Sequence, residues 1–85
     1  MIFTMYIIYS PSLDKFYIGY TSDLQKRLKE HNSGISDFTS VATDWELKYN
    51  ELFSDRKSAM NREKEIKKKK SRKYIEWLIS ISLNQ

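Results

Sequence analysis

The sequence predicts an α+β fold, with a three-stranded antiparallel sheet flanked by helices in the order β-β-α-β-α-α. Three segments are rich in β-branched and aromatic residues, as strands are, and they cover residues 3–9, 16–20 and 45–53. Three others have apolar residues at helical spacing, and each follows a residue that can cap a helix. We expect one domain over residues 1–85, since a chain of this length holds one at most.

The first two strands are predicted to form a hairpin. Residues 10–15 between them are rich in turn formers and include the only proline, whose fixed φ suits a turn. Antiparallel pairing then places Tyr6 and Tyr17 near each other on one face of the sheet.

The first helix is expected over residues 23–32. Ser22 followed by Gln25 has the spacing of a capping box, and Gly34 suits a helix end. The segment that follows, residues 35–44, has no clear period and is predicted to be a loop anchored by Phe38.

A helical projection of this helix places an arginine and the only histidine beside its packed face. At about 100° per residue, Leu24 and Leu28 share a face, His31 falls between them, and Arg27 lies on the flank. The ordinary interpretation is structural, with a boundary arginine and a core histidine whose ring is hydrogen-bonded.

The third strand, residues 45–53, alternates as a half-buried strand does. Its apolar side is expected to carry Trp45, Leu47, Tyr49 and Phe53. Glu51 interrupts that side, and we expect it to turn to solvent at the strand end.

Two helices are predicted after the sheet. Asp55 can cap one over residues 56–69, and Ser71 can cap the next. The last helix has an apolar stripe that consists of Tyr74, Trp77, Leu78 and Ile81. This stripe should pack on the sheet, and the alternative is that it forms a dimer face.

One carboxylate falls within an apolar helix stripe. Glu63 projects to the same side as Ala59 and Ile66. A buried carboxylate is costly unless it is paired or binds a cation. Two interpretations stay open: a salt bridge to Arg27 or a nearby lysine, or a metal ligand.

The net charge of +4 is concentrated in one segment. Residues 62–73 hold eight basic and two acidic residues, whereas the rest of the chain holds seven basic and nine acidic. Such a segment suits a polyanion, most simply nucleic acid, and suits a membrane less well because it lacks a broad apolar face. The alternative is that these charges form a solvated helix surface without a partner. If the segment binds substrate, the residues expected to do so are Lys67, Lys68, Lys70, Arg72 and Lys73.

Cysteine is absent, which excludes disulfides and thiolate zinc sites. The first residues lack the basic region of a signal peptide, and no apolar run approaches the roughly 20 residues of a membrane span. We therefore expect a cytoplasmic protein that does not bind membranes.

Several of these residues also share the spacing of a known family. Residues 17–19 read Tyr-Ile-Gly; Tyr6 precedes that tyrosine by eleven positions, Arg27 follows it by ten, and His31 follows Arg27 by four. Residues 59–67 read Ala-x-x-Arg-Glu-x-x-Ile-Lys. This pattern resembles the GIY-YIG nuclease superfamily, which includes homing endonucleases, the N-terminal domain of an excinuclease component and small stand-alone bacterial proteins of similar length.

The resemblance implies a metal-dependent endonuclease that hydrolyses DNA, with RNA as the less favoured alternative, in a setting such as DNA repair. It implies that Tyr6 and Tyr17 lie near the attacking water, that Arg27 contacts the phosphate, and that Glu63 holds one Mg²⁺ or Mn²⁺. His31 would hydrogen-bond the water or a tyrosine. An arginine fork contacts two phosphate oxygens, and one carboxylate suffices for a Mg²⁺ that keeps most of its waters.

Two further positions follow from the resemblance. Gly19 would let the backbone turn tightly or approach the substrate, and Asn84 matches an asparagine near the end of family domains. The first tripeptide departs from the family pattern, because Thr4 and Met5 precede Tyr6. The alternative function is a nucleic-acid-binding module that does not cleave, or cleaves only when a partner protein delivers it; the oligomeric state is not predicted.

Overall fold

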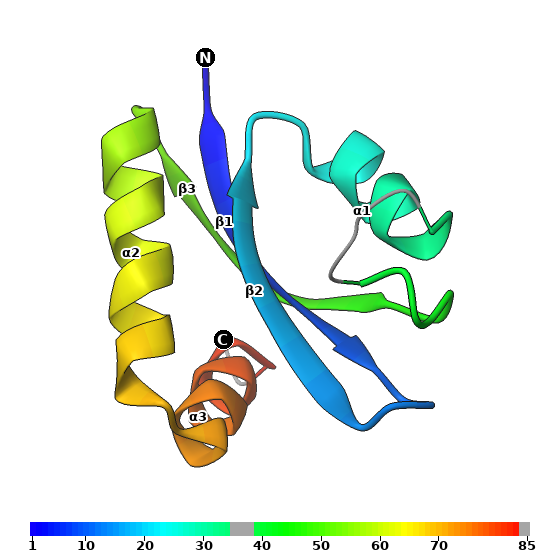
Figure 1. Cartoon of the computed structure of the whole chain (residues 1–85). Coiled ribbons are helices and arrows are strands. Elements are labelled where there is room, and N and C mark those ends of the chain that lie inside the picture. Colours follow the sequence, from blue (N-terminus) through cyan, green and yellow to red (C-terminus); the bar gives the residue numbers. More distant parts are fainter. Residues whose placement is uncertain (35–38, 84–85) are drawn as a thin grey trace.

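The computed structural model describes residues 1–34 and 39–83, and it contains one antiparallel sheet in the order β2-β1-β3 (Figure 1). The strands are β1 (Phe3–Ser10), β2 (Lys15–Thr21) and β3 (Glu46–Phe53). The helices are α1 (Leu24–Asn32), α2 (Arg56–Lys69) and α3 (Arg72–Leu83). The predicted α+β class and the element order are confirmed.

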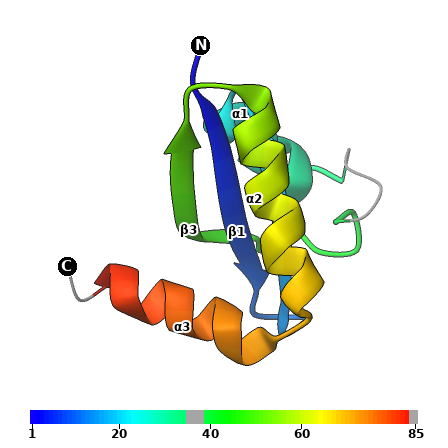
Figure 2. The same cartoon turned by 90° about the vertical axis from the view of Figure 1, so that its left-hand side faces the viewer.

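The central strand β1 contributes side chains to a core on each face of the sheet. Met5 and Ile7 pack with Ile66 of α2 on one face, whereas Tyr6 and Ile8 belong to a second cluster that α1 covers. Figure 2 shows α2 and α3 on the opposite side of the sheet from α1. Because strand residues alternate between faces, one buried strand serves both layers.

Helix capping follows the prediction in α2 and α3 but differs in α1. Asp55 accepts a hydrogen bond from Ser58 N–H, and Ser71 Oγ accepts one from Tyr74 N–H. In α1 the cap is Asp23, whose carboxylate accepts from Lys26 N–H at 3.1 Å, so the predicted capping box is wrong. Asp23 has extended backbone angles, which place its short carboxylate against the first turn.

A register shift in β3 overturns the single apolar face predicted for this strand. Ile7 and Ile8 are neighbours on β1, but their partners on β3 are Tyr49 and Leu47, so β3 has one extra residue. Such a bulge reverses the alternation of side chains along a strand. Consequently Trp45, which precedes β3, packs in the cluster beneath α1, whereas Tyr49 packs with α2 and α3.

Glu51 does not turn to solvent as predicted. Arg62 of α2 donates to both of its carboxylate oxygens, from Nε at 2.9 Å and from Nη2 at 3.1 Å. Tyr49 Oη donates to the same carboxylate. Glu51 therefore attaches α2 to the edge strand β3.

The apolar stripe of α3 packs on the sheet with one exception. Tyr74, Leu78 and Ile81 join the core, whereas Trp77 is 54% exposed. Two residues named from the sequence, Phe38 and Asn84, lie outside the described residues. Within residues 1–34 and 39–83, no helix is long and apolar enough to cross a membrane.

Candidate active site

A pocket at the exposed edge of β2 brings together residues from four elements. Tyr6 comes from β1, Tyr17 and Gly19 from β2, Arg27 from α1 and Glu63 from α2; all five line one pocket of about 400 Å³. Since β2 is an edge strand, α1 on one face and α2 on the other can both reach it. Residues 57 positions apart in the sequence thus meet at one site.

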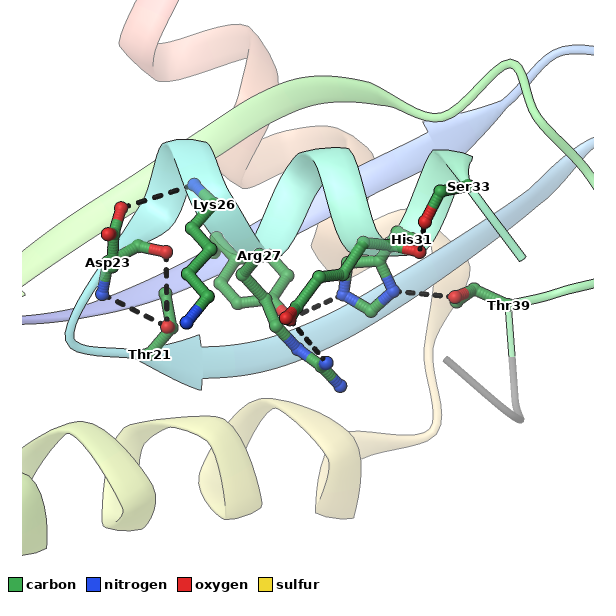
Figure 3. A network of polar contacts seen from close by, with 9 residues as sticks. Thr21, Asp23, Lys26, Arg27, His31, Ser33 and Thr39 are labelled. Atoms are coloured by element: carbon green, nitrogen blue, oxygen red, sulfur yellow. Dashed lines mark hydrogen bonds and ion pairs between the residues drawn. The ribbon is translucent and has the colours of Figure 1, made fainter. Parts of the chain in front are cut away.

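His31 lies behind this pocket and not in it. Its ring is fully buried, and Nε2 is 2.7 Å from the Tyr6 hydroxyl. On the other side of the ring, Nδ1 is 2.6 Å from Thr39 Oγ1, as Figure 3 shows. Tyr6, His31 and Thr39 therefore form a chain of hydrogen bonds, in which His31 contacts a tyrosine and is shielded from solvent.

Burial holds both rings of this chain in their neutral forms. Burial raises the pKa of Tyr6 to about 12, although a hydrogen bond with Arg27 acts in the opposite direction. Burial, and then the positive charge of Arg27, lower the pKa of His31 to about 4. At neutral pH the resting site thus holds a protonated phenol and an uncharged imidazole.

The lowered pKa of His31 predicts a loss of stability in mild acid. An unfolded histidine takes up a proton near pH 6.5, whereas folded His31 does so only near pH 4. The unfolded state therefore binds more protons within this range, and the free energy of unfolding should fall as the pH drops from 6.5 towards 4. Melting temperatures measured from pH 7 to about pH 5 should fall with a slope that His31→Gln removes.

Most carboxyl groups with a shifted pKa do not interfere with that measurement. Asp14, Asp44 and Asp55 accept hydrogen bonds that hold their pKa below the usual 3.8, so they affect stability below the chosen range. A His31→Gln protein that keeps the full slope between pH 7 and 5 would show that the slope has another source.

Gly19 serves a different purpose from the predicted tight turn. It lies inside β2, directly opposite Tyr6 on β1, and its φ is not positive. A Cβ added at this position would come within 2.6 Å of the Tyr6 hydroxyl oxygen and 2.8 Å of its ring carbon Cζ. The glycine therefore makes room for the Tyr6 ring on the strand surface.

Gly19→Ala should displace Tyr6 and lower stability. The rigid phenol cannot yield to the new methyl group without leaving His31, and overpacking of this kind costs about 1–3 kcal/mol. Chemical denaturation should show this loss, and the Tyr6 resonances should shift in an NMR spectrum. Gly34→Ala is the control, because no heavy atom lies within 4 Å of the added carbon, and only its positive φ penalises the change. Unchanged Tyr6 resonances in Gly19→Ala would contradict this explanation.

Arg27 extends from α1 towards α2 in Figure 3. Its Nη1 donates to Glu30 at 3.1 Å, and its side chain stays 33% exposed. An exposed pair of this kind contributes about 0–1 kcal/mol to stability. The guanidinium is therefore held in place at the pocket without being an essential part of the core.

Glu63 has a nearby lysine partner, as the salt-bridge interpretation of this residue predicts. Lys67 Nζ lies 3.1 Å from Glu63 Oε2, and the Glu63 side chain is 16% exposed. Within the described residues, no cluster of three or more His, Cys, Asp or Glu side chains could hold a metal. A single carboxylate in a polar pocket fits Mg²⁺ or Mn²⁺, since such ions keep several waters.

Two of the basic residues named from the sequence also make contacts within the chain. Lys67 Nζ lies 5.7 Å from the centre of the Tyr17 ring. Arg72 donates to Asp14 at 2.6 Å and lies over the Phe16 ring, so it attaches α3 to the β1–β2 turn.

Several residues at or behind the site were not expected from the sequence, among them Thr39 and Arg56. Thr39, the partner of His31, lies in a segment without periodicity, and the sequence has no signal for it. Arg56 lines the same pocket as Glu63 and lies 5.0 Å from the Phe3 ring centre. The sequence does contain a signal for Arg56. A cation in the first turn of a helix is unfavourable because it opposes the helix dipole, so an arginine there suggests a role other than helix stability.

Curated proteins with similar sequences are named UPF0213 proteins. The chain is 45% identical to one from Bacillus pumilus over 64 residues, which cover 71% of this chain and 65% of the relative. It is 42% identical to UPF0213 protein YazA of Bacillus subtilis over 67 residues, 74% of this chain and 68% of the relative. The chain thus spans about two thirds of the length of these relatives.

A solved structure and a family model agree with this similarity. The solution NMR structure of a UPF0213 protein from Bacillus halodurans is 32% identical and superimposes with a TM-score of 0.59, covering 95% of this chain and 85% of the other. The model of the GIY-YIG catalytic domain matches residues 2–75, a range that contains all nine residues that line the pocket. The chain therefore belongs to the GIY-YIG catalytic domain family.

Proposed function

We propose that this protein is a divalent-metal-dependent endonuclease that hydrolyses phosphodiester bonds of DNA. The observation that carries the proposal is the convergence of Tyr6, Tyr17, Arg27 and Glu63 on one pocket, in a chain of the GIY-YIG family. Phosphodiester hydrolysis needs a deprotonated water, stabilisation of charge on the phosphoryl oxygens and protonation of the leaving oxygen.

Arg27 binds the scissile phosphate in this proposal. Its planar guanidinium can donate two parallel hydrogen bonds to phosphate oxygens, which a lysine cannot do. Its side chain is 33% exposed and lines the pocket, so a substrate phosphate can reach the guanidinium. The guanidinium stabilises the charge that grows on these oxygens as water attacks.

Tyr6 and His31 remove the proton from the attacking water. Tyr6 takes this proton on its hydroxyl oxygen as it passes its own to His31 Nε2, which lies 2.7 Å away. This transfer requires the His31 tautomer in which Nδ1–H donates to Thr39. The negative charge of a bound phosphate offsets the positive charge of Arg27. Protonation of the His31 imidazole then costs less free energy. Tyr17 lines the pocket beside them and orients the same water.

Glu63 holds the cation. When bound, the ion would supply positive charge beside the phosphate and the leaving oxygen. The hydroxide attacks phosphorus, the phosphorus–oxygen bond of the nucleic-acid backbone breaks, and the leaving oxygen takes a proton from solvent. In the absence of the ion, Lys67 is the ion-pair partner of Glu63, at 3.1 Å from the carboxylate.

The test is incubation with nicked, branched, duplex and single-stranded DNA and with RNA, each with Mg²⁺, Mn²⁺ or EDTA. Cleavage of DNA that requires metal is expected. Binding without cleavage of any substrate would instead support the alternative of a binding module. The proposal also includes a cytoplasmic location, a role in DNA repair and delivery by a partner protein.

A further inference from the structure

A groove continues from the pocket along the exposed edge of β2. A cavity of about 290 Å³ is lined by Phe16, Tyr17, Ile18 and Lys67. Phe16, Ile18 and Lys67 also line a larger cavity of about 450 Å³ that reaches the turn between α2 and α3. Tyr17 belongs to the active-site pocket as well, so the three hollows follow one another along the edge of β2.

The groove has an apolar floor and a cationic rim. Its floor is made by Phe16 and Ile18 of β2 and by Ile66 and Ile75 of the two helices. The charged residues beside the floor are four cations and one carboxylate: Lys15, Lys67, Lys70, Arg72 and Asp14. Arg72 is paired with Asp14 and Glu76, and Lys67 is paired with Glu63. Lys15 and Lys70 therefore give the rim the positive charge that favours an anion.

Two aromatic rings present their faces to this rim. Lys67 Nζ lies over the Tyr17 ring and Arg72 Cζ over the Phe16 ring, at 5.7 and 5.2 Å from the ring centres. Both aromatic side chains are only partly buried. A base of a single strand can stack on such a ring when the cation that covers the ring face turns to a phosphate of the same strand.

From this geometry we infer that the groove holds a single-stranded stretch of the nucleic acid next to the bond that is cut. A duplex hides its base faces within the stack and would leave the apolar floor without a partner. The inference rests on the proposed nuclease function and adds a substrate class to it. It also divides the basic segment: Lys70 and Arg72 line the groove, whereas Lys68 and Lys73 are exposed elsewhere among the described residues.

The test uses binding in EDTA, so that it does not depend on cleavage. Labelled thymidine oligonucleotides, single-stranded or in a duplex of equal length, are titrated with the protein at several salt concentrations. Lys15→Gln with Lys70→Gln removes two charges from the rim. For single strands, the slope of log affinity against log salt should then fall by about 1.4, that is about 0.7 for each lost phosphate contact.

Two control variants remove the same charge elsewhere. Lys26→Gln with Lys29→Gln changes two lysines of α1 outside the groove and should leave the single-strand slope unchanged. Lys68→Gln with Lys73→Gln changes two lysines of the basic segment that lie outside the groove. This variant should lower the slope by less than half of the change expected for Lys15→Gln with Lys70→Gln. Phe16→Leu keeps an apolar floor but removes a stacking face, so single-strand affinity should fall about fivefold or more while duplex affinity holds.

The outcomes separate this inference from the proposed function. Equal losses in the groove variant and the Lys68/Lys73 variant, or tighter binding of duplex than of single strand by the wild type, would overturn the groove assignment even if the wild type cuts DNA. Conversely, a wild type that binds single strands as described but cuts nothing with Mg²⁺ or Mn²⁺ would overturn the proposed function and leave the groove in place. A melting curve of each variant shows that it is folded.

Discussion

Arg27→Ala should lower the rate of metal-dependent cleavage by at least about 100-fold, because a charged donor aimed at the reacting phosphate is lost. Stability should fall by no more than about 2 kcal/mol, because the pair with Glu30 is partly exposed and Tyr6 keeps its hydrogen bond with His31 when it loses the one with Arg27. Arg27→Lys should recover little activity, because an ammonium cannot donate two parallel hydrogen bonds to a phosphate. Single-turnover cleavage and chemical denaturation measure the two effects separately.

Lys26→Ala is the control for Arg27. It removes an adjacent positive charge from the same helix, and its exposed side chain does not line the pocket among the described residues. Activity of this control should stay close to that of the wild type. If Arg27→Ala instead cuts at the wild-type rate, or loses activity only because it unfolds, then Arg27 is a structural residue.

Glu63→Gln should abolish Mg²⁺ binding and cleavage while leaving the metal-free protein about as stable as the wild type. The substitution keeps the shape of the side chain but removes its charge. Its partner Lys67 is 49% exposed, so the released ammonium can be hydrated, and the expected cost is about 0–1 kcal/mol. Nucleic-acid affinity in EDTA should hold or rise, because one negative charge leaves the pocket.

Calorimetry with Mg²⁺ and a cleavage assay check this result, with Glu65→Gln as the matched control. Glu65 lies on the same helix, binds Arg62 and is 59% exposed, so its loss should affect neither metal binding nor cleavage. A Glu63→Gln protein that is strongly destabilised in EDTA yet still cuts DNA with Mg²⁺ would show that the carboxylate is a structural partner and not a metal ligand.

The sequence predicts the elements of this fold well because each helix and strand has local signals. Asp55 and Ser71 cap their helices as expected, and the hairpin brings the Tyr6 and Tyr17 rings to 6.4 Å. The ends of α2 were predicted to the residue. These features depend on neighbours in the sequence, which a pattern of spacing records.

Features that depend on distant partners were not predictable in the same way. The bulge in β3 arises from pairing with β1, so the alternation around Trp45 contains no sign of it. Glu51 interrupts the predicted apolar face because its partner Arg62 lies eleven residues away on a different element. Likewise the reason for Gly19 is the Tyr6 ring on the neighbouring strand, which only the register between the strands shows.

Because the pocket takes one wall from each of β1, β2, α1 and α2, no fragment that lacks one of these four elements carries a complete site. During synthesis, a chain whose α2 is still inside the ribosome has no Glu63 carboxylate at the pocket, so under the proposed function it would have no metal site. Later, any local unfolding that detaches α2 from the sheet would remove Glu63 from the pocket until the helix returns. Under the proposed function, hydrolysis would thus depend on the docking of a helix that closes the site last along the chain.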